Sequence, residues 1–520
     1  MSVDASGRLL LGPNAESILQ TGVPFLWSLA GAEDALWVGG GPPGVVYRVT
    51  PRGGVTTVMD GAAGDVQALA TGPRGEVFAA TSPDGRIVAL NADGAQREVF
   101  DPDEPYVWAL AAAADGTLYA GTGNPGRIYR IPTAGNAELL YDTGAAHVRS
   151  LALDAGGLLV AGTGSPGRVL RVDSNRRAFV LLDTSHDEIT SIRLAPDGAI
   201  LALAAGGAPA PVTAGQPAAA GSAATPVVTT SVSVTVTASA TATPTAPPPV
   251  PSTGAAAPST AAGGAVYRIA PDGVWDVVWQ STADTPYDAA LDAAGRVLVA
   301  TGPDGKLFRV EGLPRTTVLL ARATARQVTR FAEGPDGQLY YTTANPGTLY
   351  RLATNRAGSG TYVSEVHDAR TVATWGTIRW RADTPGGSSV RLQTRSGNTA
   401  VPSDTWSRWS ESYSTPSGAA ISSPRARYLQ WRASLAGDGV TPALFSVTAA
   451  YLPRNLAPEV TRVTIHPPGQ VNQRAFPTDP PIAGLDAERD PAAPAPATGS
   501  AQAPTLGRQV YRKGLQSFAW

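Results

Sequence analysis

The chain has 520 residues, of which only 16% are charged, and its formal net charge is −2. This length favours two to four domains over one, and so small a net charge lacks the basic field that nucleic acid or an anionic membrane surface requires. The chain contains no cysteine, which excludes disulfides and thiolate metal sites. It also has no apolar run long enough for a membrane span, so none is expected.

The first residues of the chain lack the charged and long apolar regions of a signal peptide. The segment Met1–Leu11 instead has the pattern of a β-hairpin. We expect residues 1–22 to form a truncated N-terminal half-blade, meaning half of the repeating unit described next. This piece either closes the ring of such units or belongs to sequence that precedes the chain.

A 41-residue repeat dominates residues 23–356, for which we predict a β-propeller. Each unit contains an apolar strand, a turn ending in glycine, a second apolar run, a turn such as Thr122–Gly126, a third strand and a fourth apolar run. Four short strands in about 40 residues are the unit of a propeller blade. Seven copies of the first hairpin begin near Leu26, Val66, Val107, Val148, Ile189, Pro286 and Val328. The sequence therefore predicts an all-β fold with seven blades, and eight blades is the alternative.

The fifth unit carries an insert at residues 205–263. Gly198 and Gly295 are 97 residues apart, against the period of 41, and the additional chain is rich in Ala, Thr and Pro. Such a composition buries too little apolar surface to offset its conformational entropy, so we predict a disordered segment. It is either a tolerated loop expansion, which costs little closure entropy, or a cover for a binding mouth.

The period ends near Tyr362, and we predict that residues 357–455 form a β-sandwich. Its tryptophans either fill the core, as aromatic residues commonly do in small β domains, or form a platform on which sugar rings stack. These tryptophans are Trp375, Trp380, Trp406, Trp409 and Trp431. A Pro-rich linker at residues 456–505 follows, and residues 506–520 are expected to begin a further, truncated β domain.

The third strand of the repeat, as in Ile128–Ile131 and Leu307–Val310, resembles that of bacterial WD-type and NHL-like propellers. Thr405–Ser410 resembles a segment of discoidin-like and laminin-G-like sandwiches in secreted bacterial proteins. The combination is similar to an uncharacterised multidomain family, over about residues 1–460. The resemblance implies an extracytoplasmic location, which means the periplasm, the cell surface or secretion. It does not imply a function, because propellers host many unrelated activities.

One arginine recurs at the same position of the repeat. A ring of arginines has the appearance of an anion site, but a repeated strand residue is better explained by packing and by pairing with local carboxylates. The set is Arg48, Arg130, Arg171, Arg268, Arg309 and Arg351.

Residues that differ from blade to blade are the functional candidates. One such residue lies near the start of the first strand of each blade, and these are Trp27, Gln67, Trp108, Arg149, Thr190, Tyr287 and Thr329. The connections between blades add Asp103, Glu104, His147, His186 and Asp187. Aromatic, acidic and imidazole groups on one face predict a ligand-binding mouth, with a solvated polar rim as the alternative. Oxygen ligands there could hold Ca²⁺, and no other cofactor is expected.

These observations predict a non-catalytic binding or scaffold protein that recognises a protein, peptide or glycan through one propeller face. Two alternatives stay open: a propeller hydrolase or lyase that uses acidic residues near Asp103 and Asp187, and carbohydrate binding by the sandwich. The chain has no Gly-x-Ser-x-Gly or His-Glu-x-x-His motif. No catalytic or metal-binding residue is therefore assigned.

Overall fold

The computed structural model describes residues 1–62, 64–207 and 263–454, and a few positions between 464 and 519. Within these residues all regular secondary structure is β, and no helix occurs that could cross a membrane. Most of the insert predicted at 205–263 lies outside the described residues, as does most of the linker predicted at 456–505.

Seven antiparallel sheets, which we number as blades 1 to 7, follow one another along the chain. Blades 1 and 2 are β4 (Phe25–Gly31), β5 (Leu36–Gly41), β6 (Gly44–Val49), β7 (Val55–Ala62), and β8 (Asp65–Thr71), β9 (Val77–Ser82), β10 (Ile87–Leu90), β11 (Gln96–Phe100). Blades 3 and 4 share a long strand and contain β12 (Tyr106–Ala112), β13 (Leu118–Ile131), β14 (Glu138–Leu153), β15 (Leu159–Gly164), β16 (Arg168–Val172) and β17 (Ala178–Asp183).

Blade 5 is the blade with the insert, between its second and third strands. Blades 5 and 6 are β18 (Glu188–Leu194), β19 (Ile200–Ala205), β20 (Gly264–Ile269), β21 (Trp275–Ser281), and β22 (Thr285–Leu291), β23 (Val297–Gly302), β24 (Lys306–Glu311), β25 (Thr316–Arg322). Blade 7 has three consecutive strands, β26 (Gln327–Glu333), β27 (Leu339–Ala344) and β28 (Thr348–Arg356).

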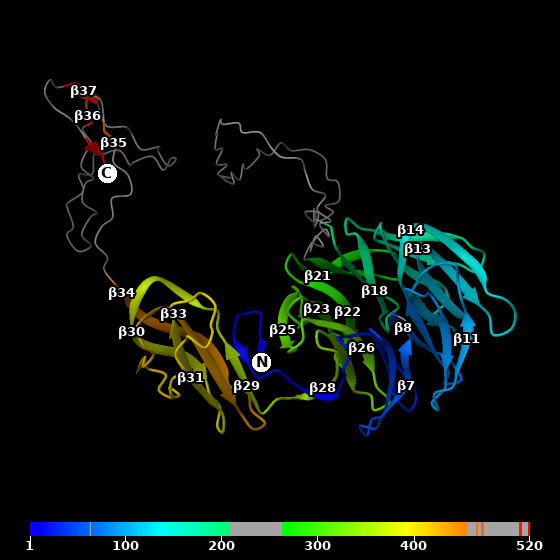
Figure 1. Cartoon of the computed structure of the whole chain (residues 1–520), viewed down its shortest axis with the longest axis horizontal. Coiled ribbons are helices and arrows are strands. Elements are labelled where there is room, and N and C mark those ends of the chain that lie inside the picture. The colour runs from blue at the N-terminus through cyan, green and yellow to red at the C-terminus, as the bar shows by residue number, and fades with distance from the viewer. Residues whose placement is uncertain are drawn as a thin grey trace, which may run out of the picture. The chain divides into compact units, whose positions relative to one another are not determined.

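The blades form a closed ring. The first strand of each blade, which we call its inner strand, contacts the inner strand of the next blade, and β26 of blade 7 contacts β4 of blade 1. The fourth strand of blade 7 is β3 (Pro13–Gln20), which pairs with β28 in the register Leu349↔Leu19 and Arg351↔Glu16. In Figure 1 this blue N-terminal strand lies beside β28. A strand from the start of the chain thus completes the last blade.

Of the two alternatives for residues 1–22, closure of the ring is the one that strand β3 fulfils, and only the part before β3 lies outside the blades. This part contains a hairpin of β1 (Ser2–Val3) and β2 (Leu9–Leu10), which pairs through β1 with β25 of blade 6 and through β2 with β34 of the C-terminal domain. The side chains of Leu9 and Leu11 are buried in the core of that domain, where their apolar surface is removed from water.

Glycine in the second strand lets neighbouring blades pack closely. A Cβ atom at Gly121 would lie 2.6 Å from a side-chain carbon of Val148, on the inner strand of the next blade. Gly162 faces Ile189 in the same way, at 2.7 Å. Val148 and Ile189 are completely buried. In these blades the close contact explains why the facing inner-strand residue is apolar.

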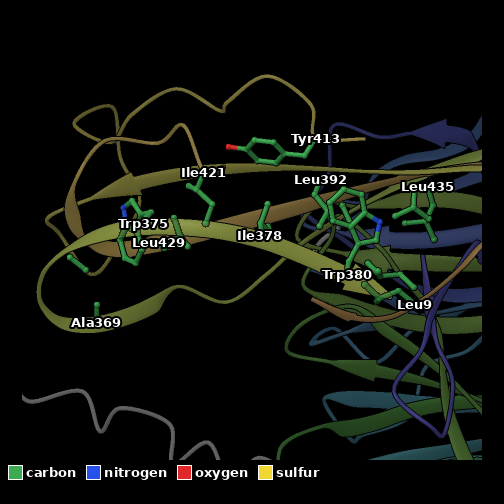
Figure 2. Close-up of a cluster of buried hydrophobic side chains, with 14 of the residues drawn as sticks. Leu9, Ala369, Trp375, Ile378, Trp380, Leu392, Tyr413, Ile421, Leu429 and Leu435 are labelled. Atoms are coloured by element: carbon green, nitrogen blue, oxygen red, sulfur yellow. The ribbon is translucent and has the colours of Figure 1, made fainter. Parts of the chain in front are cut away.

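A C-terminal β domain follows the ring. Its strands are β29 (Ser359–Val363), β30 (His367–Asp383), β31 (Ser389–Gly397), β32 (Ala419–Ala420), β33 (Ala426–Ala436) and β34 (Ala443–Pro453). Strand β33 pairs with β29, with β31 and with the first part of β30. Strand β30 also pairs with β32 and β34. Between these strands lies the core of Trp375, Ile378, Trp380 and Leu429, which Figure 2 shows.

Residues Pro453–Trp520 form a separate unit, in which only short strands are described. Strand β35 (Thr464–Ile465) pairs with β38 (Phe518–Ala519), and β36 (Gln470–Asn472) pairs with β37 (Gln509–Tyr511). Two of these strands lie inside the stretch that was predicted as a linker.

Candidate functional site

Each inner strand carries a β-bulge directly after the buried residue that starts the repeat, such as Val107 or Val148. In blade 3, Val107 pairs with Thr122 and Ala109 pairs with Gly121, so Trp108 has no partner in the ladder. The same shift occurs in all seven blades, at Trp27, Gln67, Trp108, Arg149, Thr190, Tyr287 and Thr329. A bulge redirects its side chain relative to the regular pleat. The seven residues predicted from sequence variation are therefore the seven bulge residues.

Five bulge residues keep a partly exposed side chain and, with two aromatic neighbours, form what we call the mouth. Its members are Phe25, Trp27, Gln67, Tyr106, Trp108, Arg149 and Tyr287. The rings of Tyr106 and Trp108 are stacked with centroids 5.0 Å apart, and those of Phe25 and Trp27 are stacked at 5.2 Å. The Arg149 guanidinium lies 4.4 Å from the centre of the Trp108 ring. The mouth thus presents ordered aromatic rings and one cation to solvent.

The other two bulge residues, Thr190 and Thr329, are buried and do not reach the mouth. The Thr190 hydroxyl donates to the carbonyl of Pro286 at 3.0 Å, and the Thr329 hydroxyl donates to the carbonyl of Leu26 at 2.6 Å. Each acceptor belongs to the inner strand of the next blade. The short hydroxyl side chains are used to join blades, which corrects their prediction as ligand-binding residues.

The acidic candidates also separate in the structure. Glu104 is only 2% exposed, and its Oε1 accepts hydrogen bonds from Arg127 Nη1 at 2.9 Å and from the Tyr129 hydroxyl at 3.1 Å. It is part of an internal ion pair and is not available to a ligand. Asp103 and Asp187 are exposed. The hydrolase alternative requires carboxylates that face each other, and the structure shows no contact that brings these residues together.

The two candidate histidines have different surroundings. His147 is partly exposed, and its Nδ1 accepts a hydrogen bond from Trp108 Nε1 at 3.2 Å, so it belongs beside the mouth. His186 is 4% exposed and lies 3.4 Å from the Tyr267 hydroxyl. Burial lowers the pKa of both imidazoles, and the Arg149 charge lowers that of His147 further. Both are therefore neutral in the folded protein near pH 7.

Protonation of His186 is expected to make the protein less stable at mildly acidic pH. In the unfolded chain His186 takes up a proton as the pH falls through about 6.5, whereas the buried imidazole resists protonation until a lower pH. The free energy of unfolding should then decrease by about 1 kcal/mol from this group between pH 7.5 and 5.5. Urea unfolding of His186→Gln should show a correspondingly smaller decrease in the free energy of unfolding over the same pH range. His367→Gln, which changes an exposed imidazole, is the control and should leave the decrease unaltered.

Behind the mouth, a cavity of 120 Å³ lies between the inner strands of six blades, and hence on the axis of the ring. Gln67, Trp108 and Arg149 line both the mouth and this axial cavity. Three further lining residues, Ser150, Arg193 and Arg330, were not among the predicted site residues. Arg330 and Asp288 occupy the position next to the bulge where the other five blades have serine or alanine, which is the signal that sequence comparison could have used.

A buried carboxylate supports the wall of the axial cavity. Asp288 is completely buried; its Oδ1 accepts hydrogen bonds from Arg193 Nε at 2.8 Å and from the Ser191 hydroxyl at 2.7 Å. Its Oδ2 accepts one from the backbone amide of Phe331 at 2.8 Å. Burial raises the pKa of Asp288, but the charge of Arg193 and these hydrogen bonds outweigh burial, so the pKa lies below its usual value. Asp288 is therefore an ionised structural group.

Two observations concern possible anion and metal sites. Each of the six repeat arginines pairs with a carboxylate, which confirms the structural interpretation; examples are Arg130 with Glu138 at 3.0 Å and Arg171 with Asp154 at 3.4 Å. Among the residues that the structure describes, no three His, Asp or Glu side chains are grouped to hold a metal ion.

The tryptophans of the C-terminal β domain are mostly structural. Trp375, Trp380 and Trp406 are each 6% exposed. The guanidinium groups of Arg395 and Arg432 each lie 4.6 Å from a ring centre of Trp409. The Trp409 ring thus packs against two arginines of the same domain. This arrangement disfavours a sugar-stacking platform made of these side chains.

The segment around Trp409 is held to β31 by two serines. Ser407 Oγ accepts a hydrogen bond from the amide of Ser396 at 3.0 Å, and Ser410 Oγ accepts one from the amide of Thr394 at 3.0 Å. The serine amides donate in return to the carbonyls of the same two residues, at 2.9 and 2.8 Å. The Trp-Ser-Arg-Trp-Ser motif therefore fixes an extended segment along the edge of a strand.

The closed ring of seven four-stranded blades, with a bulge residue from each blade near the axis, defines a β-propeller protein. The chain matches no protein-family model and no curated protein by sequence. Among solved structures it is similar to a virginiamycin B lyase from Staphylococcus aureus, with 11% identity over 67% of this chain and 100% of that one and a TM-score of 0.47.

Two further solved structures are similar to the chain. One is YCF48 bound to a D1 peptide, with 15% identity over 66% of this chain and 95% of that one and a TM-score of 0.44. The other is the β-propeller domain of Cps50 (Swd1) from Myceliophteria thermophila, with 13% identity, 65% and 100% coverage and a TM-score of 0.44. Identities this low concern the fold and carry no argument about function.

Proposed function

We propose that the chain is a non-catalytic binding or scaffold protein that recognises a protein, peptide or glycan through the mouth of the propeller. The observation that supports this proposal is the set of bulge residues that leave two stacked aromatic pairs and Arg149 partly exposed above a cavity. Aromatic residues and arginine are the side chains that most often dominate binding energy at protein interfaces. The composition of the mouth therefore favours a peptide or a protein segment.

The order of the mouth also supports binding. Trp108 is stacked on Tyr106, covered by Arg149 and hydrogen-bonded to His147, so its ring is held in one orientation before any ligand arrives. A preorganised side chain loses little conformational entropy when it is covered by a partner. Such a residue is the expected centre of a binding surface.

We also propose an extracytoplasmic location, and a kinship of the two domains with WD-type or NHL-like propellers and with discoidin-like or laminin-G-like sandwiches. These proposals rest on the sequence resemblance alone. Fractionation of cells that produce the protein tests the location, and recovery of the protein only with cytoplasmic markers would contradict it.

Replacement of Trp108 is expected to abolish most ligand binding. The probe is a peptide selected from a random displayed library on the wild-type chain, with a glycan array screened in parallel. Trp108→Ala should weaken binding of the selected ligand by roughly thirtyfold, which corresponds to about 2 kcal/mol for a central aromatic residue. Titration calorimetry measures the change.

Trp275→Ala is the matched control, because Trp275 is 49% exposed but lies on β21, the outer strand of blade 5. This variant should bind as the wild type does. Equal binding by wild type, Trp108→Ala and Trp275→Ala would place the binding surface away from the mouth and overturn the proposal.

A further inference from the structure

The axial cavity has an unbalanced charge. Among the described residues that line it are three arginines, Arg149, Arg193 and Arg330, and no carboxylate. Asp288 lies behind the wall and pairs with Arg193, and Glu188 lies 3.1 Å from Arg149. Two of the three guanidinium charges are therefore compensated by an adjacent carboxylate.

Arg330 is the arginine without such a partner. Its Nε donates to the carbonyl of Trp27 at 3.2 Å, and no carboxylate of the described residues lies within ion-pair distance of it. Burial lowers the pKa of Arg330, the charge of Asp288 raises it, and the like charges of Arg193 and Arg149 lower it. An arginine remains protonated even so. Three guanidinium charges thus face two carboxylates, Asp288 and Glu188, which leaves one positive charge in excess at the cavity.

Ser150 also lines the cavity and is 7% exposed. Its hydroxyl has no hydrogen-bond partner among the described residues, but this oxygen is itself buried and lies against Gly162 of the same blade. The excess positive charge carried by the arginines is therefore the feature of the cavity that points to a ligand.

We propose that the axial cavity binds a single carboxylate group, which belongs to a peptide ligand that covers the mouth. A monoanion matches the one uncompensated charge, and a planar carboxylate matches the forked donors of a guanidinium. The volume of 120 Å³ is about that of four water molecules in the liquid, enough for a carboxylate with its first carbons. Because Trp108 and Arg149 line both the mouth and the cavity, the rest of the peptide continues from one into the other. Only this last step rests on the proposed function.

The insert of blade 5 does not supply the anion. Residues 205–263 contain no aspartate and no glutamate. The insert therefore does not compete with a peptide for the cavity, and added acetate is a direct probe of the site.

The first test measures thermal unfolding of the full chain in acetate, with chloride as the balancing anion at constant ionic strength. A ligand that binds only the folded state raises the unfolding midpoint in a saturable way. The wild type should show such a rise. Arg330→Gln should lose this rise. Arg52→Gln, which changes an exposed arginine in the turn before β7, should respond as the wild type does.

Two further comparisons, with a lysine variant and with phosphate, can contradict the proposal. Arg330→Lys retains the charge without the fork, and its apparent affinity for acetate should fall by roughly tenfold. If Arg330→Gln does not fold, the comparison of Arg330→Lys with the wild type decides whether Arg330 binds acetate. An equal acetate response in wild type and Arg330→Lys, or a stronger response to phosphate than to acetate, would overturn the assignment of a carboxylate site.

The second test uses the peptide selected on the mouth. The free-acid form of this peptide is compared with a form whose terminal carboxylate is amidated and with a form whose acidic side chains are changed to amides. The form that lacks the carboxylate bound in the cavity should bind roughly tenfold more weakly. A peptide that binds the mouth equally well without any carboxylate refutes the cavity proposal and leaves the proposed function standing. An acetate response that depends on Arg330 supports the cavity proposal. If no peptide that binds the mouth is found in that case, the result counts against the proposed function alone.

Discussion

Replacing Asp288 with alanine is expected to lower the free energy of unfolding by about 3–5 kcal/mol, because the change leaves the Arg193 charge unpaired in the wall of the axial cavity. The Asp288 carboxylate accepts hydrogen bonds from Arg193, Ser191 and the amide of Phe331, so three donors lose their acceptor at once. These donors belong to blades 5 and 7, while Asp288 belongs to blade 6. The carboxylate thus joins three consecutive blades. Denaturant unfolding followed by tryptophan fluorescence measures the effect.

Asp197→Ala is the control for this experiment. Asp197 also pairs with an arginine, Arg268, but its side chain is 57% exposed. Exposed pairs contribute at most about 1 kcal/mol, so the loss should be several times smaller. The double variant Arg193→Ala/Asp288→Ala should lose less than the sum of the two single losses, since it removes both charges. Strict additivity would show that the pair is not coupled.

A disulfide across the closure of the ring is expected to stabilise the protein by about 2–5 kcal/mol. Glu16 on β3 and Arg351 on β28 are paired in register and are separated by 335 residues in sequence, so a bond between cysteines at these positions closes a very long loop. The chain has no native cysteine to compete for the new bond. The gain should appear in the oxidised Glu16→Cys/Arg351→Cys variant and disappear on reduction.

The two single variants control for loss of the ion pair between Glu16 and Arg351. They should lie within about 1 kcal/mol of the wild type, because the pair is exposed. An oxidised double variant that is no more stable than its reduced form would show that the pairing of β3 with β28 does not limit unfolding.

The ring of blades could be predicted because the repeating unit places apolar residues at a regular spacing in the sequence. The apolar residue that starts the unit returns every 41 residues over Val66, Val107, Val148 and Ile189, and three of these four face a glycine of the previous blade. The contribution of the first residues could not be predicted in the same way. The sequence left open whether β3 closes the ring, because its partner β28 lies more than 300 residues further along the chain, and the Leu9–Leu11 run does not reveal which core buries it.

The site was predictable to the extent that it follows the repeat. Sequence variation found all seven bulge positions, but it could not separate Trp108, whose ring must remain partly exposed, from Thr190, whose short hydroxyl reaches a backbone carbonyl of the next blade. The ion pair of Arg193 with Asp288 joins residues 95 positions apart. Such a pair depends on how one blade is placed against another, which the period alone does not specify.

The closure of the ring by β3 also affects how the protein is made. This strand leaves the ribosome early, and its partner β28 follows more than 300 residues later. At 5 to 20 residues per second, roughly 20 to 70 s separate the two. During that interval blade 7 does not exist, and the nascent chain carries an unpaired strand that can join the edge of a sheet in a neighbouring nascent chain. Synthesis on crowded polysomes would therefore favour exchange of β3 between copies unless a chaperone covers it until translation has passed β28.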